Sequence, residues 1–176
     1  MREWISIRSL FCSGDNMSVH DVTIRKAKDT DIQQLAEVWN KSWHAGHGHL
    51  DPIAAKFRDL PYFEARIGSG LARMIVAEED GKIVGFSGWE GDGIGQVFIA
   101  PSHFGKDVAP RLLATVEAVL KAEGHERIWL HCAVGNDRAR RFYEKNGWYV
   151  ARVFDDEIGT REGPRPMRAW HMEKDI

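Results

Sequence analysis

The sequence lacks the features that mark secreted, membrane-spanning and disulfide-stabilised proteins. It has 2 cysteines in 176 residues, and these two, Cys12 and Cys132, lie far apart. Cys132 falls in an apolar, strand-like stretch, so the pair gives no disulfide framework and favours a reducing compartment. No apolar run is long enough for a membrane-spanning helix. The N-terminal residues hold only short apolar patches, which make a poor secretory signal. We therefore expect a cytoplasmic protein.

The sequence also has no large excess of positive or negative charge. The 24 Lys and Arg residues nearly balance the 26 Asp and Glu residues, which leaves a net charge of -2, and no long basic run occurs. Nucleic-acid and membrane-surface partners therefore have no electrostatic support. Repeats and low-complexity segments are also absent. What remains, 43% hydrophobic and 28% charged residues, is typical of a globular domain with a buried core.

The domain is expected to begin near a second methionine. Met17 opens a stretch that leads directly into the first expected strand, residues 22–26. We interpret residues 1–16 as a leader from an upstream start codon or as a disordered extension. The alternative is that they pack on the domain. Residues 17–176 then form a single domain.

Periodicity predicts the helices and strands of the first half of the chain. One helix follows an N-cap at Asp29 or Thr30, and its apolar stripe consists of Ile32, Leu35, Ala36 and Trp39. A glycine-rich loop with three histidines, residues 42–52, separates it from a second helical region that begins at Asp51-Pro52. Three strands are expected next, with a hairpin turn between the last two: residues 73–78, 83–90 and 94–100.

The second half continues the alternation of helices and strands. A long amphipathic helix ends at Gly124, and its apolar stripe consists of Leu112, Leu113, Val116, Val119 and Leu120. Strands are expected at residues 127–132, 148–153 and 167–173. The polar segment 155–166 is expected to be a mobile loop. This order predicts an α/β protein with a mixed sheet and flanking helices.

The most informative segment is residues 136–148, which read NDRARRFYEKNGW. Asn136 is a good helix N-cap with Asp137 in the first turn. Tyr143 follows two helical turns later, so both side chains lie on nearly one face. Asn146-Gly147 then supply a helix stop. A polar Asn and Tyr on one side of a helix suggest a site as well as a core contact.

This segment closely resembles the last motif of the GNAT N-acetyltransferase superfamily, N-x-x-A-x-x-F-Y-x-x-x-G-F/W. The resemblance covers residues 20–174. It implies the GNAT-like acyl-CoA N-acyltransferase fold, a central mixed sheet of about 6–7 strands flanked by about 4 helices. It implies acetyl-CoA as co-substrate, Asn136 holding its pantetheine arm, and Tyr143 as the general acid that reprotonates the departing thiolate. The alternative is an amphipathic helix whose tyrosine only packs in the hydrophobic core and has no catalytic role.

The segment PSHFGKDVAPRLL, residues 101–113, aligns with the family's pyrophosphate loop but departs from it. Aligned on Pro101, Gly105 and Ala109 match the family run P-x-x-Q/R-G-x-G-x-G/A, whereas Phe104 replaces the usual Gln or Arg and Asp107 replaces a glycine. Asp107 is a competent N-cap that could occupy the phosphate-binding amides and repel the diphosphate. The resemblance implies these cofactor-binding residues: Phe98, Ile99, Phe104, Gly105, Lys106, Asp107, Val108, Ala109, Asn136 and Tyr143. It also places backbone N–H groups near residues 98–100 at the thioester.

The acceptor side is less clearly marked. Glu90 and His131 are candidate bases, and the alternatives are a solvated carboxylate and a packed or surface histidine. His44, His47 and His49 lack a cysteine partner and a metal-ligand spacing, so we expect no metal, and substrate contact or a solvated loop remain open. The candidate substrate-binding residues are Trp43, His44, His47, Trp89 and Trp170, in which the tryptophans would form an aromatic wall or pack in the core.

These features favour an enzyme that transfers an acetyl group from acetyl-CoA to a primary amine, by direct attack in a ternary complex. Cys132 is not expected to carry the acyl group, because it lies in an apolar strand and has no base. The acceptor is a small-molecule or peptide amine. The alternatives are a non-catalytic CoA-binding module, motivated by Phe104 and Asp107, and a scaffold that binds no CoA. The alternating final strand suggests a homodimer paired through a sheet edge.

Overall fold

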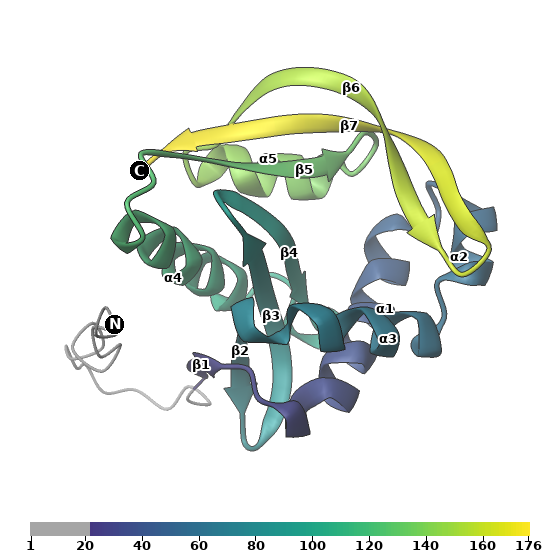
Figure 1. Ribbon diagram of the computed structural model, residues 1–176, viewed down its shortest axis with the longest axis horizontal. Coiled ribbons are helices and arrows are strands. Elements are labelled where there is room, and N and C mark those ends of the chain that lie inside the picture. Colours follow the sequence, from purple (N-terminus) through teal and green to yellow (C-terminus); the bar gives the residue numbers. More distant parts are fainter. Residues whose placement is uncertain (1–21) are drawn as a thin grey trace.

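The computed structural model describes residues 22–176, and Figure 1 shows how their helices and strands are arranged. Residues 1–16, interpreted above as a leader or extension, lie outside the described residues, as does Cys12. The described chain forms these strands: β1 (Thr23–Lys26), β2 (Met74–Glu79), β3 (Lys82–Glu90), β4 (Gly93–Ile99), β5 (Arg127–Ala133), β6 (Tyr149–Thr160) and β7 (Gly163–Asp175). It forms these α-helices: α1 (Ile32–His47), α2 (Pro52–Phe57), α3 (Leu60–Gly70), α4 (Val108–Ala122) and α5 (Asp137–Lys145). Short 3-10 turns are η2 (Asp29–Asp31), η3 (Leu71–Arg73) and η4 (Pro101–His103).

The described strands form one seven-stranded sheet in the order β1-β2-β3-β4-β5-β7-β6. Neighbouring strands are antiparallel except β4 and β5, which are parallel. β4 and β5 pair only at Gly93 with Trp129 and at Ile94 with Leu130. Beyond these two pairs the strands separate and leave a wedge in the sheet. The expected α/β fold with a mixed sheet and flanking helices is confirmed.

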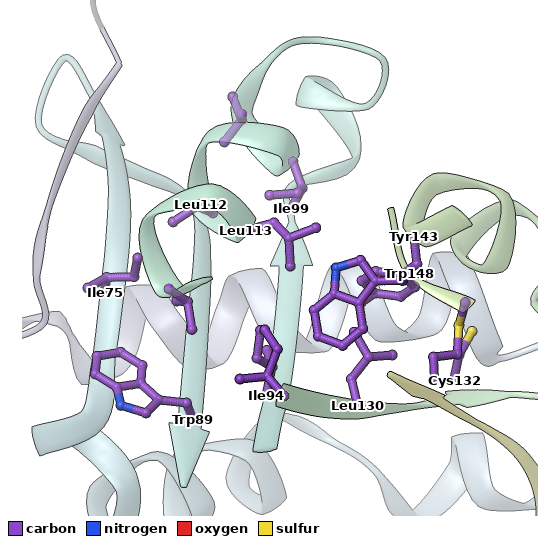
Figure 2. Close-up of a cluster of buried hydrophobic side chains, with 14 of the residues drawn as sticks. Ile75, Trp89, Ile94, Ile99, Leu112, Leu113, Leu130, Cys132, Tyr143 and Trp148 are labelled. Atoms are coloured by element: carbon purple, nitrogen blue, oxygen red, sulfur yellow. The ribbon is translucent and has the colours of Figure 1, made fainter. Parts of the chain in front are cut away.

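Helices cover both faces of the sheet, and each face has its own hydrophobic core. Strand alternation sends Ile75 to one side and Val76 to the other. The Ile75 side packs beneath α4 and α5, and Figure 2 shows this cluster with Leu113 and Tyr143. The Val76 side packs against α1 and α3, where Phe63 is fully buried. The sheet that contains the wedge is thus packed on both faces.

α2 begins at the capping residue that the sequence predicts, whereas α1 begins after Asp31 rather than after Asp29 or Thr30 and ends later than expected. The Asp51 carboxylate accepts hydrogen bonds from the N–H groups of Ile53 (3.0 Å) and Ala54 (2.9 Å), which confirms the start of α2. The expectation of a histidine loop at residues 42–52 is wrong in part, because α1 continues through His47. Burial of Trp43 against the α3 core outweighs the roughly 1 kcal/mol that a helical glycine such as Gly46 costs.

The expectation of a mobile loop at residues 155–166 is wrong. This segment belongs to β6 and β7, which form a long hairpin that turns between Thr160 and Gly163. The hairpin tip lies beside α2 in Figure 1. The carbonyl oxygen of Gly159 accepts hydrogen bonds from Arg58 (2.6 Å) and Tyr62 (2.7 Å), and the Arg161 N–H donates to Phe57 (3.0 Å). These contacts, together with Ile158 packed against the core beside α1 and α3, hold this polar segment in place.

The final strand is not available for edge pairing. β7 lies between β5 and β6, so both of its edges are occupied, and the sheet ends at β1 and β6. The suggestion that the last strand forms a dimer through its own edge is therefore wrong. Within residues 22–176, no helix is long and apolar enough to cross a membrane.

Candidate active site

A cleft of about 550 Å³ opens where β4 and β5 separate. Its walls are the facing edges of these two strands. One end is closed by the C-terminal part of α1, including Gly46 and His47, and the other by the loop before α4 and by one face of α5. The cleft therefore joins segments from both halves of the chain.

Backbone N–H groups of β4 face the cleft. Ala100 donates its N–H to the carbonyl oxygen of Val84 in β3 (2.8 Å), and successive amides of a strand point to opposite sides. The N–H groups of Val97 and Ile99 therefore point toward β5, where the ladder has already ended at Ile94. Of the expected donors at residues 98–100, only Ile99 points into the wedge.

Asn136 joins α5 to the end of α1. Its Oδ1 accepts a hydrogen bond from the Ala139 N–H (3.1 Å) and caps α5, as the sequence predicts. Its Nδ2 lies 3.2 Å from Nε2 of His47. Because an amide nitrogen only donates, His47 Nε2 accepts, and the imidazole is the neutral form protonated at Nδ1. Burial lowers the pKa of His47 to about 4, so this form persists at neutral pH.

Tyr143 lines the cleft with a buried phenol. Its ring packs against Phe142 and Trp148, and only 9% of the residue is exposed. Burial raises the pKa of the phenol, so the hydroxyl keeps its proton at neutral pH. Burial also raises the pKa of the neighbouring Cys132 thiol to about 12, which leaves no thiolate to carry an acyl group. A protonated hydroxyl therefore lies beside an inert thiol.

The loop before α4 turns toward the cleft at Gly105, whose φ of +80° favours glycine. His103 anchors the loop, because its Nε2 lies 2.9 Å from the Glu79 carboxylate. Asp107 precedes α4 but its side chain makes no capping hydrogen bond. Asp107 is also not among the residues that line the cleft. The concern that its carboxylate occupies the phosphate-binding amides is therefore not supported.

The end of the cleft beside α4 and α5 carries positive charge. Lys106, Arg138, Arg141 and Lys145 all line it, and no Asp or Glu lines the cleft anywhere in the described part of the chain. The protein as a whole has a net charge of -2, so this local excess of cations is specific to the site. A glycine turn, a helix N-terminus and several cations together suit a polyphosphate ligand.

A sequence model of the Acetyltransferase (GNAT) family matches residues 32–148, two thirds of the chain. The chain belongs to this family. An uncharacterized N-acetyltransferase from Mycobacterium tuberculosis strain H37Rv is 30% identical over an alignment of 105 residues, and the match covers 54% of this chain and 67% of the relative.

Solved structures of the family share the fold. A GCN5-related N-acetyltransferase from Rhodopseudomonas palustris aligns with a TM-score of 0.72 at 20% identity, over 92% of this chain and 100% of that one. The PaiA N-acetyltransferase from Thermoplasma acidophilum, solved with coenzyme A, aligns with a TM-score of 0.70 at 20% identity, over 89% of this chain and 99% of that one.

Membership of the GNAT family makes acetyl-CoA the co-substrate, and the cleft fits it. The cations and the loop at Gly105 suit the phosphates, and the wedge between β4 and β5 suits a narrow arm. Most of the residues proposed to hold the cofactor line the cleft: Phe98, Ile99, Phe104, Gly105, Lys106, Ala109, Asn136 and Tyr143. Asp107 and Val108 do not line the cleft, since Asp107 is exposed and Val108, the first residue of α4, is buried in the core.

His131 lines the cleft and belongs to a chain of four hydrogen-bonded groups. Its Nδ1 lies 3.2 Å from the Asp156 carboxylate, and its Nε2 lies 3.1 Å from Nδ1 of His171. The chain ends where His171 Nε2 lies 3.1 Å from the Glu173 carboxylate. Three hydrogen bonds between two carboxylates and two imidazoles need three N–H groups, one more than two neutral imidazoles carry. The complete chain therefore holds one additional proton.

The other candidates on the acceptor side lie outside the cleft. Glu90 is exposed at the hairpin turn, and Trp89 is 7% exposed in the core beneath α4, so neither lines the cleft. Trp170 is buried with Arg140 over its ring (4.9 Å), so the expected aromatic wall does not form. Trp43 stacks on His47 (5.6 Å), one layer behind the cleft.

The histidine-rich segment contributes one residue to the cleft. Of its three histidines, only His47 lines the cleft, whereas His44 contacts Trp43 and His49 is exposed. No cluster of metal-ligating side chains occurs among residues 22–176.

Sequence reasoning missed His171, Asp156 and Arg138. Arg138, Arg141 and Lys145 recur at helical spacing on α5, and that signal could have been found. His171 and Asp156 meet His131 only through the pairing of β5, β6 and β7, which no local pattern encodes.

Proposed function

We propose that this protein transfers the acetyl group of acetyl-CoA to a primary amine by direct attack in a ternary complex. The observation that carries the proposal is the placement of the protonated Tyr143 hydroxyl in the same cleft as the cations of α5 and the open edge of β4. A protein that only binds CoA has no need of a buried acid there.

Acetyl-CoA supplies an activated thioester carbonyl when it is bound. The N–H groups of Val97 and Ile99 are available to orient the pantetheine amides and to polarise that carbonyl. Tyr143 holds a proton at its hydroxyl oxygen for the leaving sulfur. Asn136 has one amide N–H left for the pantetheine arm, since the other donates to His47.

The amine must lose a proton before or as it attacks. His131 lines the cleft and Glu90 does not, so we assign the base to the His131–His171 pair. The complete chain of hydrogen bonds has three N–H groups. When the histidine pair carries only two, it can accept the ammonium proton, directly or through one water. The resulting imidazolium lies between the carboxylates of Asp156 and Glu173, which stabilise it.

We further propose that the protein is cytoplasmic and that the acceptor is a small-molecule or peptide amine. The buried free thiol of Cys132 supports a reducing compartment. A homodimer remains a proposal, and it would use the free edge of β6 or β1 rather than β7.

The test is release of free CoA thiol from acetyl-CoA over a panel of primary amines, with Tyr143→Phe beside the native chain. Phenylalanine keeps the buried ring and removes the acid, so kcat should fall by about 10²-fold or more, while the Kd of acetyl-CoA should change by less than about twofold. A non-catalytic CoA-binding module would bind acetyl-CoA and release no thiol with any amine. A scaffold would bind no acetyl-CoA at all.

A further inference from the structure

Position 104 no longer supplies a polar side chain to the phosphate end of the cleft. Phe104 stands where the family motif has Gln or Arg, and its ring packs against the core beneath α4. The ring also lines the cleft. A phenyl group offers neither charge nor a hydrogen-bond donor to a diphosphate. The positive charge that binds the diphosphate must therefore come from another residue, or the site binds the diphosphate more weakly.

A guanidinium lies directly on this ring. The Cζ atom of Arg138 lies 3.9 Å from the centre of the Phe104 ring, well within the range of a cation–π contact. Arg138 is the second residue of α5, so its backbone is fixed by the helix that Asn136 caps. This contact brings a planar fork of N–H donors to the place where the motif side chain is missing.

Arg138 is also free to take an anion. It makes no ion pair with a carboxylate among residues 22–176, and it lines the cleft beside Lys106. Arg140, two residues along α5, contrasts with it. Arg140 donates to the Glu144 carboxylate (2.8 Å), lies over Trp170, and does not line the cleft. Of these two arginines, Arg138 lines the cleft and has no carboxylate partner among the described residues.

We propose that Arg138 binds the diphosphate of acetyl-CoA in place of the side chain that position 104 has lost. The ring of Phe104 lies against the guanidinium beside the loop at Gly105 and restricts it, so less side-chain entropy is lost when the anion binds. The second positive charge of Lys106 offsets the nearby carboxylate of Asp107. The inference rests on the co-substrate of the proposed function, but it concerns binding and not acetyl transfer.

The test is calorimetric titration of acetyl-CoA into the native chain, Arg138→Ala and the matched control Arg140→Ala, without an acceptor amine. Loss of a charge-assisted contact should weaken Kd about 10- to 100-fold in Arg138→Ala, whereas Arg140→Ala should stay within about twofold of the native Kd. The dependence of Kd on salt should also become shallower in Arg138→Ala, because one cation fewer meets the ligand.

Two further arms separate the possible causes. Acetyl-dephospho-CoA lacks the 3′-phosphate but keeps the diphosphate. Arg138→Ala should therefore weaken its binding by the same factor as it weakens the binding of acetyl-CoA. Phe104→Arg placed in the Arg138→Ala background should restore at least about tenfold of the lost affinity, because it returns a cation to the loop. Thermal unfolding of each variant checks that α5 is intact.

The proposal is overturned if Arg138→Ala binds acetyl-CoA like the native chain, or if only the ligand with the 3′-phosphate is weakened. It is also overturned if Arg140→Ala is weakened as strongly. Thiol release that persists alongside unchanged binding by Arg138→Ala would reject this inference and leave the proposed function standing. If Arg138→Ala binds acetyl-CoA more weakly as expected but no amine gives thiol release, this inference stands and the proposed function is rejected.

Discussion

His47 should make the stability of the fold depend on pH in a way that one substitution removes. The imidazole is buried at the end of α1, and burial lowers its pKa from 6.5 to about 4. The unfolded chain therefore binds a proton that the folded chain does not, between these two pKa values. The contribution of His47 to the free energy of unfolding is fully present above pH 6.5. It falls as the pH drops and levels off near pH 4.

The size of the effect follows from the two pKa values. For one group with these values, the free energy of unfolding falls by about 2 kcal/mol between pH 7 and pH 5, and by about 3 kcal/mol between pH 7 and pH 4. Protonation also removes the lone pair that accepts the hydrogen bond from Asn136, so the same titration loosens the cap of α5.

The assay is urea unfolding of the native chain and of His47→Gln at several pH values from 7.5 to about 4.5. Glutamine keeps an acceptor for Asn136 and does not titrate, so the difference between the two proteins isolates the imidazole. The native chain should lose about 2 kcal/mol more than the variant by pH 5. Parallel stability curves for the two proteins would refute the argument that burial holds His47 neutral.

Two further predictions concern the strand junction and the base. Gly93→Ala should lower stability by about 1–3 kcal/mol, because the added methyl would lie 2.5 Å from the Trp129 ring. Gly95→Ala, whose methyl would meet only the Gly88 carbonyl oxygen at 4.0 Å, is its control in thermal unfolding. Burial lowers the pKa of His131, and the neighbouring His171 lowers it further, so His171→Gln should raise the pKa of His131 and move the acidic limb of the kcat/KM profile to higher pH. An unchanged pH profile would exclude the pair as the base.

The sequence predicts those parts of the site that are local in the chain. The cap at Asn136, the position of Tyr143 two turns later and the glycine turn at Gly105 each depend on a few neighbouring residues. Their types carry a specific backbone preference or a helical spacing. The fold class followed from the order of such segments, and the mixed sheet confirms it.

The parts that failed depend on contacts between distant segments. The tip of the β6–β7 hairpin, residues 155–166, reads as a polar loop, and it is held by Arg58 and Tyr62, which lie about a hundred residues earlier in the chain. The length of α1 depends on the burial of Trp43 under α3. No alternation of residue types records that His171 will pair with His131 across two strands.

The wedge between β4 and β5 is bounded on more than one side. The pairs at Gly93 and Ile94 join the strands at one end, and the hairpin tip fastened to Arg58 and Tyr62 joins the two halves of the domain at another. A gap framed in this way has a width set by the protein before any ligand arrives. Acetyl-CoA would then enter a prepared slot, so little of its binding energy would be spent on ordering the chain.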